Sequence, residues 1–307
     1  MNFRKNYYGS LGVKTIDVRV SVESSLQGEV LSIDCRIQQL CLWIRIPHMY
    51  RPIVWKVLLG ILPVSTKAWS YVSNQRKEQY NLIKEATSIL LNDPKMYFEM
   101  MKEELTPKRL ACMLIVELQP DSAYNVLQIL ESNPPEHLIR MAKTFLEICD
   151  DLDEVDAFWM YLGFIVKLKV PLDDQYKDIY DLQSLLNYHS TELCNHLKKL
   201  NIPLSQITTP WYKSYFCGVL NYQSLEGIFD IIIGGESAIL PYIALSLFLA
   251  CSRKLLACKS DKDVYNITNN ISKHVDLYAV AQTSVDIWEK PLLDKMNHET
   301  KRNLGLK

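Results

Sequence analysis

The chain has 307 residues, of which 48% are hydrophobic and 22% charged, and its formal net charge at pH 7 is −1. This composition is ordinary for a globular protein, and the length suits one large domain or two small ones. A nearly neutral chain has no general electrostatic attraction for nucleic acid or an anionic membrane, so we expect neither as a partner. Glycine and proline are scarce, and the helical spacing of apolar residues predicts an all-α protein.

Eight cysteines are scattered through helix-like segments, and none form a C-x-x-C pair. The six histidines do not cluster with them, so the chain lacks the grouped ligands that a zinc site requires. The N-terminus is polar and basic, without the apolar core of a signal peptide. We therefore expect reduced, buried thiols in a cytoplasmic protein, with no metal and no cofactor.

Residues 1–45 are expected to form an N-terminal arm and a lead-in helix. Within them, residues 13–22 alternate between apolar and polar side chains, which favours a short strand or an extended arm. We assign residues 46–252 to the main domain. Residues 253–307 are predicted to add C-terminal helices packed on that same domain.

The most patterned stretch is residues 46–63. Pro52 suits the first turn of a helix, and Gly60 suits the position just after its end. The residues between them are apolar except for Lys56, which predicts a helix packed on several sides. Arg51 and Trp55 lie four residues apart, on one face of this helix. Because a cation at a helix N-terminus opposes the helix dipole, Arg51 is expected to have a carboxylate partner from elsewhere.

Further helices are predicted along the rest of the chain. A polar loop and then a helix occupy residues 64–92, and Pro134-Pro135-Glu136 marks another helix start. Residues 238–251 are apolar or small, but they are too few for the roughly 20 needed to span a bilayer. We therefore predict a buried core helix there and no transmembrane segment.

Two stretches resemble a known family. The pattern Arg-x-x-x-Trp-Lys that begins at Arg51 and includes Trp55, followed by Leu-Leu-Gly, resembles the opening motif of the TBC (Tre/Bub/Cdc) domain. An acidic loop before Ala-Phe-Trp159 resembles a patch in the middle of that domain. The resemblance implies a single all-helical domain of the Rab GTPase-activating type.

A third stretch extends the resemblance with departures. Asp230 and Gly235 resemble the Arg-x-Trp-Asp…Gly segment of TBC domains, but Gly227 takes the place of the arginine and Phe229 that of the tryptophan. Arg51, Trp55, Trp159 and Asp230 would then be structural motif residues. The region from about 95 to 133 matches the family poorly.

Neither catalytic motif of active TBC proteins is present. The family pattern supplies an arginine finger in I-x-x-D-x-x-R and a glutamine in Y-x-Q, and no arginine or glutamine of this chain has that context. An arginine finger is worth roughly 10³–10⁵ in the rate of GTP hydrolysis. Near the expected places the chain offers Arg109 and Arg140, which we interpret as solvent-facing helix cations, with service as surrogate fingers as the alternative. No catalytic residue is therefore assigned.

The resemblance is strongest to one small member of the family, which docks on the coiled coil of hamartin. It implies a non-catalytic adaptor that supports the tuberous sclerosis complex in restraining target-of-rapamycin signalling. Such a subunit would be cytoplasmic, with recruitment to lysosomal or other endomembranes through the complex. Two alternatives stay open, namely a Rab GTPase-activating protein with non-standard residues and a non-catalytic Rab binder.

A docking face for the coiled coil is predicted in residues 96–105. On a helix, Tyr97, Met100, Met101 and Leu105 would share one side, and methionine is common on surfaces that bind partner helices. The segment falls where the catalytic arginine motif is missing. The alternative is that this face packs into the domain's own core.

Overall fold

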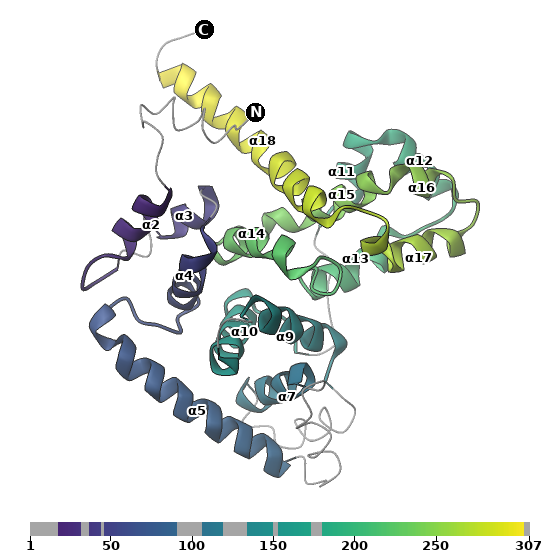
Figure 1. The fold of residues 1–307 in the computed structure, drawn as a ribbon. Coiled ribbons are helices and arrows are strands. Elements are labelled where there is room, and N and C mark those ends of the chain that lie inside the picture. The colour runs from purple at the N-terminus through teal and green to yellow at the C-terminus, as the bar shows by residue number, and fades with distance from the viewer. Residues whose placement is uncertain are drawn as a thin grey trace. The chain divides into compact units, whose positions relative to one another are not determined.

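The structure, a computed structural model, describes residues 18–31, 37–43, 46–90, 106–118, 134–149, 153–172 and 180–303. Over these residues the regular elements are helices, joined in two places by isolated β-bridges (Figure 1). The predicted all-α class is therefore confirmed. The predicted docking residues Tyr97, Met100, Met101 and Leu105 lie outside the described residues.

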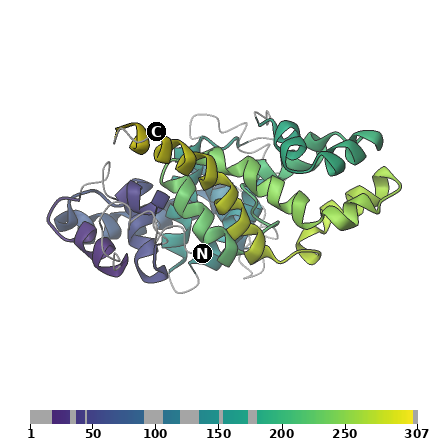
Figure 2. The same cartoon turned by 90° about the horizontal axis from the view of Figure 1, so that it is seen from above.

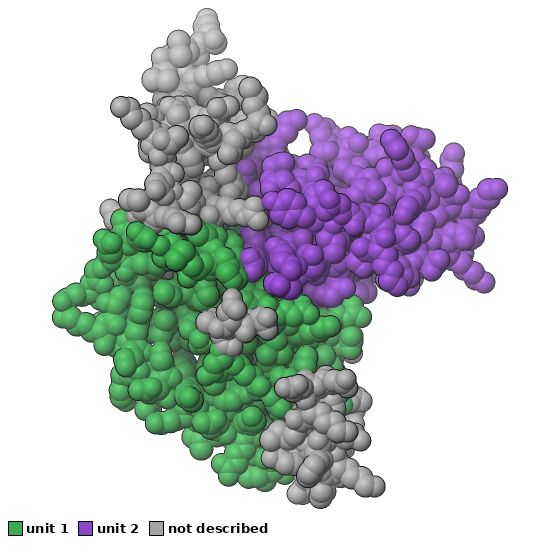
Figure 3. Space-filling model, in the orientation of Figure 1, with its two compact units in different colours: residues 1–174, 229–236 green, residues 175–228, 237–307 purple. Residues whose placement is uncertain are grey.

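The chain divides into two compact units, coloured green and purple in Figure 3. Unit 1 contains residues 1–174 and 229–236, and unit 2 contains residues 175–228 and 237–307. The dividing point at residue 229 lies inside one helix, α14 (Tyr222–Ile233). The predicted boundaries at residues 46 and 252 stay predictions.

Unit 1 contains the patterned stretch of residues 46–63. Its described elements are α2 (Val18–Leu26), α3 (Gln38–Trp43), η2 (His48–Tyr50), α4 (Arg51–Leu58), η3 (Thr66–Ala68), α5 (Trp69–Leu90), α7 (Thr106–Leu118), α9 (Glu136–Ile148) and α10 (Glu154–Leu168), together with the last part of α14. Within this unit α7 packs against α9 and α5, and α10 packs against α9 and α5. Figure 1 shows α5 as a long helix beside these three.

Local signals explain where several of these helices begin and end. Pro52 occupies the first turn of α4, and Gly60 follows the helix with φ +73°, a conformation that glycine adopts without strain. Asp153 precedes α10 and accepts a hydrogen bond from the backbone N–H of Val155. The helix start predicted at Pro134-Pro135-Glu136 is confirmed by α9.

The core of unit 1 is a cluster of aromatic rings. Trp55 is fully buried, and its ring lies 6.4 Å from Phe145 and 6.2 Å from Phe229, measured between ring centroids. Phe164 closes the cluster at 4.8 Å from Phe229 and 5.3 Å from Phe145. These rings come from α4, α9, α10 and α14, so the predicted central position of the α4 helix is confirmed.

Unit 2 is built around one apolar helix. Its described elements other than α14 are α11 (Leu182–His189), α12 (Thr191–Lys199), α13 (Leu204–Lys213), η5 (Ser237–Ile239), α15 (Leu240–Ala250), α16 (Ser252–Leu256), α17 (Asp261–Asn269), η6 (Ile271–Lys273) and α18 (Leu277–Asn303). The helix α15 is buried along most of its length and packs against α11, α13 and α18. Figures 1 and 2 both show α18 lying across α15. The predicted buried helix is thus confirmed, and none of the described helices is long and apolar enough to cross a membrane.

One prediction for the N-terminal region is wrong. Residues 18–22 of the predicted strand or extended arm (residues 13–22) belong to the helix α2, and residues 13–17 lie outside the described residues. Val22 is fully buried and packs against Leu40 of α3. The strand prediction rested on the alternation of apolar and polar side chains. In the structure the segment is instead a helix that buries Val22 against α3.

Candidate functional site

The Arg51 side chain lies in a buried polar cluster within unit 1. Its Nε and Nη2 atoms donate to the two carboxylate oxygens of Asp230, at 3.0 and 3.1 Å, and Nη2 also donates to the carbonyl of Ile46 at 2.9 Å. The indole N–H of Trp55 donates to the same carboxylate at 2.8 Å. The carboxylate partner expected for Arg51 is therefore Asp230.

This buried cluster joins two helices rather than forming a binding site. The side chains of Arg51 and Asp230 are only 5% and 2% exposed, so no ligand from solvent reaches them. The chain is also tight beside the cluster, because a Cβ on Gly234 would lie 2.8 Å from the Cβ of Cys41. Burial, and then the charge of Asp230, raise the pKa of the Cys41 thiol, which makes it unreactive. Arg51, Trp55 and Asp230, the expected structural motif residues, thus meet in this one buried cluster.

A second cluster connects α5, α7 and α10. Arg109 Nη2 donates to both carboxylate oxygens of Glu154 at 2.7 Å, and the hydroxyl of Tyr80 donates to the same carboxylate. Burial opposes the ionisation of Glu154, but the hydrogen bonds from Tyr80 and Arg109 outweigh it and hold the pKa of Glu154 below its usual range. The interpretation of Arg109 as a solvent-facing cation is wrong, since its side chain is 9% exposed. The residue is buried because α7 lies between α5 and α9.

Two more arginines of unit 1 interact with neighbouring side chains. Arg140 is exposed, as predicted, and its Nε donates to Glu136 one turn earlier on α9 at 3.0 Å. The guanidinium of Arg76 lies over the ring of Trp159, 4.4 Å from the ring centroid, and the indole N–H of Trp159 donates to the carbonyl of Arg76 at 3.0 Å. Trp159 therefore fixes α10 to α5, which is a structural role.

Metal and thiol chemistry have no support in the described part of the chain. No three of its histidine, cysteine, aspartate and glutamate side chains come together as a possible metal site. The seven cysteines within it are all buried and free of disulfides. The burial of these seven cysteines agrees with the expected buried thiols.

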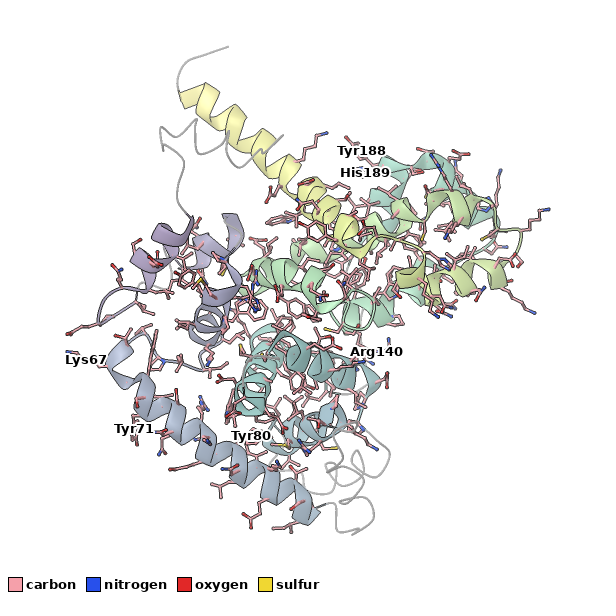
Figure 4. The ribbon with its side chains drawn as sticks, in the orientation of Figure 1. Lys67, Tyr71, Tyr80, Arg140, Tyr188 and His189 are labelled. Atoms are coloured by element: carbon pink, nitrogen blue, oxygen red, sulfur yellow. The ribbon has the colours of Figure 1, made fainter. Side chains whose placement is uncertain are left out.

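The outer face of α5 carries a feature that the sequence reasoning missed. Tyr71, Leu82 and Ile89 are 69%, 65% and 66% exposed, whereas Tyr80 on the same helix points inward and is 4% exposed. Figure 4 shows Tyr71 on the outward side of α5 and Tyr80 on the side that faces α10. The sequence contains these apolar residues at separations of 11 and 7 positions, but this spacing does not tell whether the face they share is buried or exposed.

Comparison with known proteins shows the family of the chain. Residues 48–256, about two thirds of the chain, match the model of the Rab-GTPase-TBC domain family. The chain belongs to this family, and the family resemblance seen in its sequence is confirmed.

Several individual proteins are similar to the chain over nearly its whole length. TBC1 domain family member 7 of Bos taurus is 27% identical over 293 residues, and the match covers 94% of each chain. The human and zebrafish (Danio rerio) proteins of the same name are each 26% identical, with coverage of at least 94% on both sides. Among solved structures, the Ypt/Rab-GAP domain of Gyp1p is similar with a TM-score of 0.61 at 14% identity, covering 90% of this chain and 99% of that one. That likeness concerns the fold.

Proposed function

We propose that this protein is a non-catalytic TBC-fold adaptor that binds a helical partner. The observation that carries the proposal is the state of Arg109, the arginine nearest the expected place of the missing finger motif. It is buried, and its guanidinium is held by both oxygens of Glu154. An arginine finger has to reach the γ-phosphate of a GTPase bound outside the domain. Arg109 would have to leave its carboxylate partner to do so.

The other arginines add to this argument. Arg140 is exposed, but its pairing with Glu136 along one helix is the ordinary arrangement of a surface cation. Arg76 is stacked on Trp159. A glutamine in the Y-x-Q context is also missing from the sequence. A Rab GTPase-activating function would therefore need residues outside both known motifs.

The partner is proposed from the family resemblance. The overall match to TBC1 domain family member 7, at about the same length, supports a shared role as a subunit that docks on the coiled coil of hamartin. The protein would then support the tuberous sclerosis complex in restraining target-of-rapamycin signalling. Its place would be the cytoplasm, with recruitment to lysosomal or other endomembranes through the complex.

The direct test is co-elution of the purified chain with a C-terminal coiled-coil fragment of hamartin in size-exclusion chromatography. We expect a stable complex with wild-type protein. Absence of a complex, together with binding of the chain to a GTP-loaded Rab in the same experiment, would contradict the adaptor proposal and favour non-catalytic Rab binding.

The residues Tyr97, Met100, Met101 and Leu105 remain proposed as contacts for this partner. The double variant Met100→Glu/Met101→Glu tests them. A folded variant that loses the hamartin fragment supports the contact. A variant that unfolds shows that the face belongs to the core, and a folded variant that binds normally shows that the partner docks elsewhere.

A further inference from the structure

The three exposed apolar residues of α5 lie along one face of the helix, and we name them the α5 ridge: Tyr71, Leu82 and Ile89. An α-helix turns by about 100° per residue, so separations of 11 and 7 residues return to the same direction within about 20°. Tyr71 and Ile89, 18 residues apart, are separated by five full turns, or about 27 Å along the helix. Each of the three side chains is about two-thirds exposed.

This alignment distinguishes the α5 ridge from ordinary surface residues. Nine large hydrophobic side chains are strongly exposed in the described part of the chain, and the other six lie on six different segments. Single exposed apolar residues are normal and need no explanation. Three along one face of a single 22-residue helix are not scattered, and apolar side chains that share a helix face are the kind of anchors that helix–helix docking uses.

The charges beside the α5 ridge define the kind of partner. Glu78 and Glu85 both lie about 40–60° to one side of Leu82, by the same helical geometry. The cations Lys77 and Lys84 lie on the far side of the helix, and Lys84 is placed over the ring of Tyr80, 5.8 Å from its centroid. Within about a quarter turn of the α5 ridge, the only charged residues of α5 are therefore the two glutamates.

Neither glutamate forms an ion pair with another residue that the structure describes. In the part of the chain that the structure describes, Glu78 accepts a hydrogen bond from Gln75, and no salt bridge to a cation forms at Glu78 or Glu85. Two carboxylates seven residues apart beside an apolar line are the arrangement in which coiled-coil helices choose oppositely charged neighbours.

We propose that the α5 ridge docks one amphipathic helix whose apolar seam is flanked by Lys or Arg residues seven apart. Tyr71, Leu82 and Ile89 would supply the apolar anchors, and Glu78 and Glu85 would select the basic partner and fix its register. This inference rests on the adaptor function proposed above, and it assigns to that function a surface and a partner chemistry.

The test uses the full-length chain and two synthetic peptides that are stapled to stay helical. Both carry leucines at the 7- and 11-residue spacing; one has lysines and the other glutamates beside the leucines. Fluorescence anisotropy should show that wild-type protein binds the lysine peptide at least about tenfold more tightly, because two ion pairs replace two repulsions. The variant Glu78→Lys/Glu85→Lys should reverse this preference.

Two single variants separate the apolar line from the rest of the helix. Leu82→Glu should weaken binding of the lysine peptide at least about tenfold, because a charge replaces the leucine anchor that the bound peptide would cover. Asn81→Glu adds the same charge at the neighbouring exposed position, about 100° around the helix on the side of Glu78 and Glu85, and should not weaken binding of the lysine peptide. Both positions are exposed, so circular dichroism should show unchanged helicity.

The proposal is overturned if wild-type protein prefers neither peptide, if Glu78→Lys/Glu85→Lys does not reverse the order, or if Leu82→Glu and Asn81→Glu bind alike. It is also overturned if the hamartin fragment binds wild-type protein and Leu82→Glu equally well. If only the proposed function is wrong, the result is different. The peptides then bind as expected, and the hamartin fragment does not bind wild-type protein.

Discussion

Replacing Asp230 with alanine tests the buried cluster that joins α4 to α14. The substitution leaves the guanidinium of Arg51 with only the carbonyl of Ile46 among the bonds described above, and it removes the acceptor of the Trp55 indole N–H. Removing one partner of a buried ion pair typically costs about 3–5 kcal/mol. Because Arg51 is 5% exposed, water cannot replace the lost carboxylate. We expect the free energy of unfolding to fall by that amount.

Urea denaturation followed by circular dichroism measures this change. Asp230→Asn keeps an acceptor for Trp55 and should cost less than Asp230→Ala. The double variant Arg51→Met/Asp230→Leu removes both charges and should recover at least about 1 kcal/mol relative to Asp230→Ala, since the uncompensated charge is gone. Glu29→Ala is the matched control, because Glu29 pairs with Lys67 at an exposed site and its loss should cost less than about 1 kcal/mol. A loss for Asp230→Ala as small as that of Glu29→Ala would refute the reasoning.

Two further predictions concern unit 1. The pKa of Glu154 is depressed in the folded protein, so the contribution of Glu154 to stability is complete above the ordinary glutamate pKa of about 4.3 and is lost as the pH falls through the folded value. In urea titrations at a series of pH values, Glu154→Gln should therefore lose less stability than wild type below a pH of about 4.3. An equal loss in the two proteins would contradict the assignment. Gly163→Ala should destabilise the protein by about 1–3 kcal/mol, because the new Cβ would lie 2.9 Å from the Cβ of Leu59 and 3.2 Å from its carbonyl oxygen. Gly227→Ala is its control, since nothing lies within 4 Å of that Cβ and the helix should gain up to about 1 kcal/mol; equal melting behaviour of the two variants would show that Gly163 is not tightly packed.

Much of the fold could be predicted from residue patterns. The bounds of α4 followed from Pro52 and Gly60, and the need of Arg51 for a carboxylate followed from the helix dipole. That this carboxylate is Asp230, 179 positions later, is known only from the structure, because no local rule in the sequence pairs the two residues. Pairing over such a distance is decided by packing, as the rings of Trp55 and Phe229 show.

The surface was harder to predict. Arg109 was interpreted as exposed because charged side chains on helices usually face solvent, yet α7 packs against α5 and α9, and Arg109 pairs with Glu154 of α10. The α5 ridge was missed for the opposite reason. Its residues carry no local mark of exposure, and only the position of α5 against α7 and α10 shows which face is left outside.

Single-turnover GTP hydrolysis with a panel of Rab proteins tests the central claim most directly. The account predicts that the purified chain leaves the hydrolysis rate of every Rab close to its intrinsic value, and that Arg109→Ala and Arg140→Ala change nothing in this assay. An acceleration of about 10³-fold or more, abolished by Arg109→Ala or Arg140→Ala, would show that a surrogate finger acts and would contradict the account.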